Sequence, residues 1–224
     1  MSLIISRKPT LGIGVYSVPD VAQILGLETS LVRRWLAEYW GDKLKKEQKI
    51  YSSWGSGREK AVHFYTLMEF YVFYQLRKQG VSAQSIVKSH NIISSDLSTQ
   101  YPFANSIILT DGKKIFYTID QETIINADKS RQINFKEIIE HFCQKIDFGS
   151  DKLALRYWPL GKDKNIIIDP HHQFGQPTIK NTNILAETLF KMYTAGEKIP
   201  FISSLYDVPE KDVKASIAFF NKAA

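Results

Sequence analysis

Residues 17–40, SVPDVAQILGLETSLVRRWLAEYW, combine two helical patterns with one glycine between them, and this combination restricts the fold more than any other segment. Ser17 and Asp20 have the spacing of a capping box, which predicts that a first helix begins there. Gly26 then supplies a residue that adopts positive φ without steric cost. Apolar side chains recur at helical spacing on both sides of that glycine. The pattern predicts a helix-turn-helix.

The second of these helices carries polar groups on its outward face. Thr29 or Ser30 can cap it, and Arg33 and Arg34 follow about one turn later. Guanidinium forks and small hydroxyls near a helix start suit the major groove of duplex DNA, where they reach guanine edges or phosphates. Two interpretations stay open, because a pair of helices with solvated charges also occurs in proteins that bind no nucleic acid.

The positive charge of the chain is concentrated in the same region. Of the 224 residues 44% are hydrophobic and 23% charged, with a net charge of +6. Residues 1–95 hold 13 lysines and arginines against 7 aspartates and glutamates, whereas the rest of the chain is balanced at 16 of each. An excess confined to one segment favours a polyanionic partner over a general effect on solubility.

A candidate wing follows the second helix. The segment GDKLKKEQKIYSSWGSGREKAVHFY is rich in lysine around a Gly/Ser turn that carries Trp54. Short alternations at 50–51 and 62–64 flank the turn, which is typical of a β-hairpin. Such a wing would lie along the sugar-phosphate backbone and position the protein without reading base sequence. The alternative is a solvated surface hairpin.

Two further helices are predicted before residue 95. Thr66 and Glu69 have capping-box spacing at the start of an aromatic-rich stripe that reaches Gly80, and a shorter helix, 83–90, follows Ser82. We interpret the aromatic stripe as hydrophobic core rather than as a ligand-binding box.

Residues 12–90 resemble the DNA-binding domain of MerR-type regulators. The resemblance rests on SVPDVAQILGL, VRRWL, the basic turn, HFYTLMEF and LRKQGVSAQSI. It implies a winged helix-turn-helix followed by a second helical pair. The usual Arg-x-Tyr at the end of the wing is His63-Phe64-Tyr65 here, and the long dimerising coiled coil and metal-sensing cysteines of that family are absent. The candidate DNA-binding residues are Thr29, Ser30, Arg33, Arg34, Lys45, Lys46, Lys49, Arg58, Lys60 and Tyr65.

In the middle of the chain the hydrophobic residues alternate with a period of two, which is typical of β-strands. Asp111-Gly112 is a strong signal for a two-residue hairpin turn, and a third strand at 123–126 completes a meander. A helix at 135–142 and an extended stretch at 153–158 follow. The extended stretch is expected to alternate, with Leu153, Leu155 and Tyr157 on one face. No catalytic constellation appears in this part.

The last segment begins with a buried-strand run at 165–169 that Pro170 stops. Helical patterns at 185–195 and 199–206 follow, and Asp207 with Glu210 predicts the cap of a third helix.

This segment is similar to the C-terminal domain of VapB-type antitoxins. The similarity rests on Ile168-Asp169-Pro170, Phe174-Gly175-Gln176-Pro177-Thr178-Ile179-Lys180, Asn183-Ile184 and Ala195-Gly196-Glu197. It implies a type II antitoxin that binds and inhibits a PIN-like ribonuclease toxin and represses its own operon. Where the family commonly has glycine this chain has Asn181, which we expect in the left-handed region.

The antitoxin interpretation assigns two further surfaces. Adjacent phenylalanines in the last helix cannot both be buried by one small helix, so we expect a partner surface there. We expect a homodimer that places two recognition helices on a palindromic operator, through an arm at 176–182 or an edge of the central sheet. The candidate partner-binding residues are Ile217, Phe219 and Phe220. The candidate dimerisation residues are Gln176, Pro177, Thr178, Ile179 and Lys180.

Other chemistry is not indicated. His171 and His172 are adjacent, so their side chains diverge, and no further ligands stand at metal-binding spacing. We expect no cofactor and no enzyme, because no nucleophile–base or nucleotide-binding pattern is present. Cys143 reads as a buried hydrophobe, and its being alone fits a reducing cytoplasm. No apolar run has the length of a signal peptide or a membrane span.

Together these patterns predict an α+β fold, mostly helical. They predict a winged helix-turn-helix domain at 1–95, a linker with a small β-meander and helix at 96–164, and a C-terminal three-helix bundle with a β-arm at 165–224. The first functional hypothesis is the DNA-binding antitoxin. The alternatives are a MerR-like ligand-responsive regulator without a toxin partner, and a dimerising scaffold that binds no nucleic acid.

Overall fold

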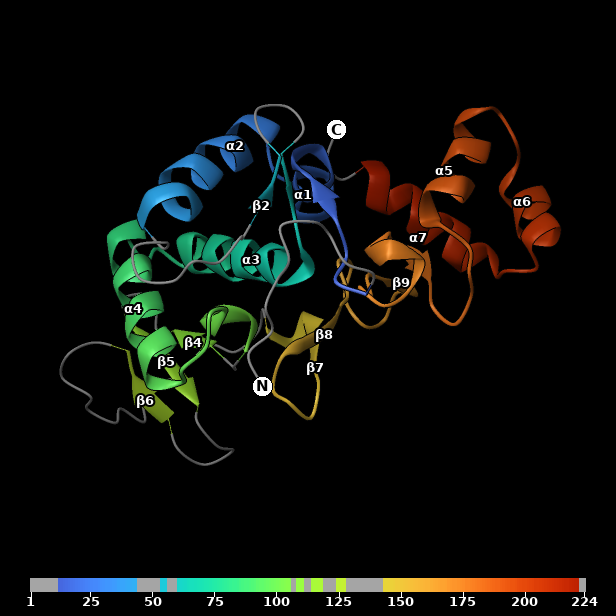
Figure 1. The fold of residues 1–224 in the computed structure, drawn as a ribbon. Coiled ribbons are helices and arrows are strands. Elements are labelled where there is room, and N and C mark those ends of the chain that lie inside the picture. Colours follow the sequence, from blue (N-terminus) through green and yellow to red (C-terminus); the bar gives the residue numbers. More distant parts are fainter. Residues whose placement is uncertain are drawn as a thin grey trace. The chain divides into compact units, whose positions relative to one another are not determined.

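The structure is a computed structural model that describes residues 12–43, 53–55, 60–105, 108–110, 114–118, 124–127 and 143–221. It is an α+β fold with small antiparallel sheets (Figure 1). The chain forms two compact units, and each is assembled from segments that are not consecutive. The first unit contains Met1–Arg33, Ser53–Phe64 and Leu155–Ala224, and the second contains Arg34–Ser52 and Tyr65–Ala154. The three consecutive domains expected above stay a prediction.

In the first unit, the strand β1 (Tyr16–Ser17) leads directly into the helix α1 (Val18–Leu25). Ser17 accepts a hydrogen bond from the Asp20 N–H, and the Asp20 carboxylate accepts one from the Ser17 N–H, so the expected capping box is present. Gly26 ends α1 with φ 64° and begins the turn to α2 (Thr29–Ala37). The expected order of helix, glycine turn and helix is therefore confirmed.

A three-stranded sheet stands beside α1 in the first unit. β3 (Ala61–Val62) is central and pairs antiparallel with both β1 and β2 (Ser53–Trp54). Val62 is opposite Tyr16 on one side and Ser53 on the other. The strand expected at 50–51 lies outside the described residues.

The rest of the first unit is built on a short hairpin and three helices. β8 (Ala154–Tyr157) is bridged to Ile168, directly after β9 (Ile166–Ile167), and β9 pairs antiparallel with β10 (Thr178–Ile179). The helices are α5 (Ala186–Thr194), α6 (Ile199–Tyr206) and α7 (Glu210–Asn221), and α7 contacts both of the others. Between β9 and β10 lies a single 3-10 turn, η5 (Gln173–Gly175).

Two side chains explain how α7 is held. Asn165 donates to both carboxylate oxygens of Asp212, at 3.0 and 3.2 Å, and Asp212 is buried. Val213 and Phe219 complete the buried face of α7. A buried carboxylate needs such donors, because burial without them would cost several kcal/mol.

The second unit has an aromatic core. After residue 37 the chain continues in the π-helix η1 (Glu38–Lys43), and α3 (Phe64–Lys78) packs its aromatic side chains against this region. Trp40 stacks on Phe70 at 4.1 Å between ring centroids, and Trp35 meets Phe73 edge-on at 4.9 Å. These rings are buried, which confirms that the aromatic stripe is core.

The remaining elements of the second unit follow α3. They are α4 (Ala83–Asp96), η3 (Pro102–Ala104), β4 (Ile108–Thr110), β5 (Ile115–Thr118), β6 (Ile124–Asn126), η4 (Cys143–Lys145) and β7 (Ile146–Phe148). β4, β5 and β6 form the expected antiparallel meander, and Tyr117 on β5 donates to Asp96 at the end of α4, at 2.6 Å. The turn Asp111-Gly112 and the helix expected at 135–142 lie outside the described residues.

Three local expectations are wrong. α3 begins at Phe64, two residues before Thr66, so Thr66 and Glu69 do not form a cap. Asp207 ends α6 in the left-handed conformation, with φ 51°, rather than capping α7. In β8, Leu155 is exposed, so the strand does not alternate as the sequence suggested.

Candidate functional site

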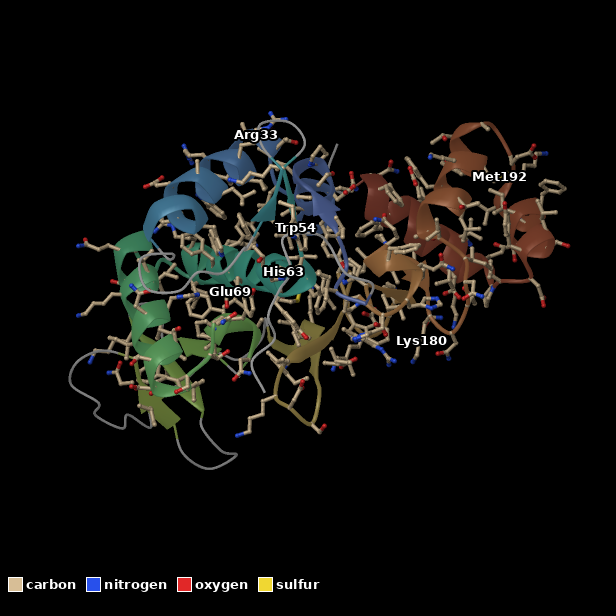
Figure 2. All side chains as sticks on the ribbon, viewed as in Figure 1. Arg33, Trp54, His63, Glu69, Lys180 and Met192 are labelled. Carbon is tan, nitrogen blue, oxygen red and sulfur yellow. The ribbon has the colours of Figure 1, made fainter. Side chains whose placement is uncertain are left out.

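The outward face of α2 collects the polar residues expected to meet DNA. Ser30, Arg33 and Arg34 are exposed and Thr29 is half-buried, while Val32 on the opposite face is fully buried. Thr29 and Arg33 are four residues apart, as are Ser30 and Arg34, so each pair lies on one side of the helix. Figure 2 labels Arg33 on α2. The described part of this helix therefore presents two hydroxyls and two guanidinium groups to solvent.

The candidate wing is only partly described. Lys60 precedes β3 and is half-buried, and Tyr65 lies at the start of α3 with its ring 5.5 Å from that of Tyr101. Burial raises the pKa of Tyr65, with a further contribution from Asp151. Four expected DNA contacts, Lys45, Lys46, Lys49 and Arg58, lie outside the described residues.

A buried histidine, His63, occupies the position where MerR-type regulators usually have the arginine of the wing. His63 is 1% exposed and lies edge-on to Trp54, with ring centroids 5.9 Å apart (Figure 2). Burial lowers the pKa of His63 to about 3, so the imidazole is neutral at physiological pH. A neutral buried ring cannot take the place of a solvent-facing guanidinium at a phosphate, so His63 belongs to the core.

The expected dimerisation arm pairs within its own chain. β10 is hydrogen-bonded to β9, and Thr178 and Ile179 are each 1% exposed. Pro177 is also buried, whereas Gln176 is half-buried and Lys180 is exposed. Dimerisation through this arm stays a prediction, and it would use Gln176 and Lys180 unless the strand changes partners.

The turn after β10 has the conformation expected of it. Asn181 has φ 61°, in the left-handed region. The Thr182 hydroxyl donates to the Ile179 carbonyl at 2.9 Å and accepts from the Ile184 N–H at 3.0 Å. Asparagine therefore fills a position that favours glycine, because its short side chain tolerates that backbone.

The expected partner-binding residues are less exposed than the sequence suggested. Phe219 is 1% exposed and is a core residue, while Ile217 and Phe220 are half-buried. The Phe220 ring stacks on Phe190 at 4.9 Å between centroids. Phe219 consequently offers no surface to a partner as α7 is packed here.

Among the C-terminal helices, the exposed large apolar side chains lie instead on α5 and α6. Tyr193 is 42% exposed, Phe201 50% and Leu205 56%. Sequence reasoning missed them because it assigned the apolar positions of each helix to the core. The signal was the composition of α6, IPFISSLY, which is apolar on more than one side although only Ile202 is buried.

A small groove of about 90 Å³ is lined by residues from three of the predicted functional segments. α1 contributes Gln23, the arm contributes Gln176 and Pro177, and α7 contributes Phe219 and Phe220. The Gln23 side-chain amide donates to the carbonyls of Phe219 and Phe220, at 3.2 and 3.3 Å. These carbonyls belong to the last turn of α7, where helix carbonyls lack intrahelical partners. The first helix of the candidate DNA-binding element thus caps the last helix of the candidate partner-binding element.

The described residues contain no group of three or more histidines, cysteines, aspartates or glutamates that could hold a metal ion. His171 Nδ1 lies 3.5 Å from the Asp169 carboxylate, whereas His172 Nε2 lies 2.8 Å from the Thr182 carbonyl. The two rings therefore have different partners. In the same described part of the chain, no helix is long and apolar enough to cross a membrane.

Comparison with known proteins relates the chain to one family model, one relative identified by sequence and one solved structure. Residues 166–220, from β9 to α7, match the model described as "Protein of unknown function (DUF433)". A relative described as "Putative antitoxin VapB45", from Mycobacterium tuberculosis (strain ATCC 25618 / H37Rv), is 24% identical over 174 residues, which cover 72% of each chain. The crystal structure of Rv2018 from Mycobacterium tuberculosis has a TM-score of 0.67 at 17% identity and covers 93% of this chain and 100% of that one. At this identity the likeness establishes a shared fold.

Proposed function

We propose that this protein is a DNA-binding antitoxin of a type II toxin–antitoxin system. It binds and neutralises a PIN-like ribonuclease toxin and represses its own operon. The observation that carries the proposal is the similarity to the relative described as an antitoxin, because it extends over 72% of both chains rather than over one small motif.

DNA binding is supported by the chemistry of α2. Arg33 and Arg34 are exposed together with Ser30, and the excess positive charge of the chain falls within residues 1–95. Arginine forks on an exposed helix face are the groups that most often contact guanine edges and phosphates. We infer that α1 and α2 act as a helix-turn-helix with α2 as the recognition helix.

Toxin binding is supported by the C-terminal helices. Residues 166–220 form the part that matches the family model, and the exposed Phe201 and Leu205 lie within it. Apolar side chains half-exposed on neighbouring turns of one helix are typical of the buried centre of a protein interface. We therefore place the toxin contact on α6 and α5, next to Ile217 and Phe220.

Co-expression with the open reading frame adjacent to the gene tests the toxin contact. The neighbouring protein should co-purify with the wild-type chain and lose its growth-inhibiting ribonuclease activity. The double variant Phe201→Ser/Leu205→Ser should lose both effects, whereas Leu155→Ser, which removes an apolar side chain that is 37% exposed on β8, should keep them. A wild-type chain that purifies alone and leaves the toxicity of its neighbour unchanged would reject the proposal.

Binding to the promoter fragment upstream of the operon tests the DNA contact. The affinity should fall steeply with salt, and Arg33→Ala should weaken it by about 1–3 kcal/mol. Lys211→Ala, which removes an exposed cation on α7, should leave it unchanged. Equal affinities of Arg33→Ala and Lys211→Ala would exclude α2 as the recognition helix.

We further propose that the DNA-bound form is a homodimer. Two recognition helices would then lie about one turn of DNA apart, roughly 34–36 Å, on a palindromic operator. Light scattering over a range of concentrations, with and without operator DNA, checks this arrangement. A monomer at every concentration and on DNA would contradict it.

A further inference from the structure

A pocket of about 310 Å³ lies beside the turn that follows β10, in the first unit. Its walls come from the end of β8, with Arg156 and Trp158, from Asp169 and His172 after β9, and from the turn Lys180–Asn183. This volume is within the range of small-ligand sites. None of the residues that line it belongs to α2 or α6.

Hydrogen bonds hold the walls of this pocket in place. His172 Nε2 lies 2.8 Å from the Thr182 carbonyl, and the Lys180 N–H donates to the Asn165 carbonyl at 2.8 Å. The Thr182 hydroxyl and the left-handed Asn181 shape the turn between them. A ligand would therefore meet preorganised groups, which reduces the entropy lost on binding.

Part of the positive charge in the pocket has no anionic partner among the described residues. Arg156 contacts Asp169 through Nε, at 2.8 Å, and Asp169 also accepts the His171 N–H at 2.9 Å. Asp169 is thus satisfied by donors on both carboxylate oxygens. The two terminal nitrogens of Arg156 have no partner among the described residues, and the Arg156 side chain is 46% exposed.

Lys180 supplies a second cation at the same pocket (Figure 2). Its ammonium lies 5.3 Å from the centroid of the Trp158 ring and has no carboxylate partner among the described residues. The cation–π contact fixes the position of the charge and leaves its hydrogen-bond donors available. Once Arg156 and Asp169 have offset each other, the ammonium gives the pocket a net positive charge.

We propose that this pocket binds a phosphate group. The free edge of a guanidinium can donate to two phosphate oxygens at once, and an ammonium acts on a third as a point charge. A phosphate monoester has three terminal oxygens in a tetrahedral arrangement and can meet both cations at once, whereas acetate has two oxygens in one plane. The phosphate is either that of a small phosphorylated compound, which has these three oxygens, or one in a nucleic acid backbone, whose two non-bridging oxygens would each contact one of the two cations.

Titration calorimetry at constant ionic strength tests this site in the full-length protein. Inorganic phosphate and adenosine monophosphate are the probes, and acetate is the anion control. We expect Kd for phosphate on the order of 1 mM and at least about tenfold weaker binding by Lys180→Gln. Arg156→Lys, which keeps the charge but loses the fork, should also bind more weakly. Lys191→Gln, which removes an exposed cation of α5, should bind like the wild type.

A competition experiment with duplex DNA distinguishes the two sources of phosphate. If duplex DNA competes with inorganic phosphate and Lys180→Gln weakens duplex binding, the source is a nucleic acid. If duplex binding is the same for Lys180→Gln and Lys191→Gln while phosphate binding differs, the source is a small compound. No binding of phosphate or adenosine monophosphate, equal affinity for acetate, or equal affinities of Lys180→Gln and Lys191→Gln would overturn the proposal.

Discussion

The side chain of Tyr16 lies against Gly175 so closely that a Cβ atom on Gly175 would overlap the tyrosine hydroxyl. Gly14 also contacts this ring, with a hypothetical Cβ 2.8 Å from the hydroxyl oxygen. Tyr16 is completely buried, and its hydroxyl has no hydrogen-bond partner among the described residues. The Tyr16 ring of β1 therefore packs directly against Gly175 in the turn between β9 and β10, although 158 residues lie between the two in the sequence.

Gly175→Ala should destabilise the protein more than Gly196→Ala does. Both glycines have positive φ, 81° and 100°, so both substitutions introduce backbone strain of about 1–2 kcal/mol. A Cβ at Gly196 would have nothing within 4 Å, whereas at Gly175 it also collides with Tyr16, which should add about 1–3 kcal/mol. Urea unfolding of the two variants measures the difference.

Tyr16→Phe tests the cause of that difference. Removing the hydroxyl takes away the closest of the clashing atoms, while the ring carbon that bore it, 2.9 Å from the hypothetical Cβ, remains. The Tyr16→Phe/Gly175→Ala double variant should consequently recover part of the stability lost in Gly175→Ala. Strictly additive free energies would show that the two residues do not interact.

His63 should make the protein less stable as the pH falls below neutral. Burial lowers its folded-state pKa to about 3, whereas the unfolded chain binds a proton near pH 6.5. The stabilisation is therefore complete above pH 6.5 and is lost between pH 6.5 and about 3, with about 1.4 kcal/mol lost by pH 5.5. Denaturant unfolding at pH 7.5 and 5.5 measures the slope, which His63→Leu should reduce; an unchanged slope in His63→Leu would contradict this origin.

Glu69 should be far more sensitive to truncation than to loss of charge. Its carboxylate lies 2.5 Å from His90 Nε2 and accepts the Phe103 N–H at 2.8 Å, and Glu69 is 1% exposed. Glu69→Leu leaves both donors without a partner and should cost about 3–5 kcal/mol. Glu69→Gln can keep its one oxygen at the Phe103 N–H and turn its amide NH2 toward His90 Nε2, which accepts in the other tautomer, so it should cost less than half as much. Equal costs of the two variants would show that the pair contributes only through its charge.

Gln23→Ala should loosen the last turn of α7. The amide of Gln23 satisfies two carbonyls there, and their loss should cost about 1–2 kcal/mol. Hydrogen exchange should accelerate at residues 216–221 and stay unchanged in α4. Gln84→Ala, an exposed substitution on α4, serves as the control, and equal effects of both variants on α7 would contradict the capping role.

Features set by neighbouring residues could be predicted from the sequence. The Ser17–Asp20 capping box, the turn at Gly26 and the Ser82 cap of α4 each depend on a few consecutive residues, and each is present. The left-handed Asn181 is also present, but its prediction came from the resemblance to antitoxins that commonly have glycine there. The meander of β4, β5 and β6 was also predictable, because its turns join strands that are adjacent in the sequence.

Features set by distant residues could not be predicted in this way. Glu69 has the spacing of a capping residue, yet its partners are His90 and Phe103, more than twenty residues away. The burial of Phe219 depends on packing against other elements of the first unit, and a helical stripe does not reveal which of two adjacent rings faces inward. The candidate phosphate pocket could not be predicted for the same reason, since Arg156 lies on β8 and Lys180 lies in the turn after β10.

The first unit joins residues near 16–33 to residues beyond 155. During translation, Tyr16 emerges from the ribosome long before Gly175, and Gln23 emerges long before the carbonyls that it caps. β1 and α1 must therefore wait for almost the whole chain before their packing is complete. A nascent or truncated product that lacks the later helices would leave this surface bare to chaperones and proteases.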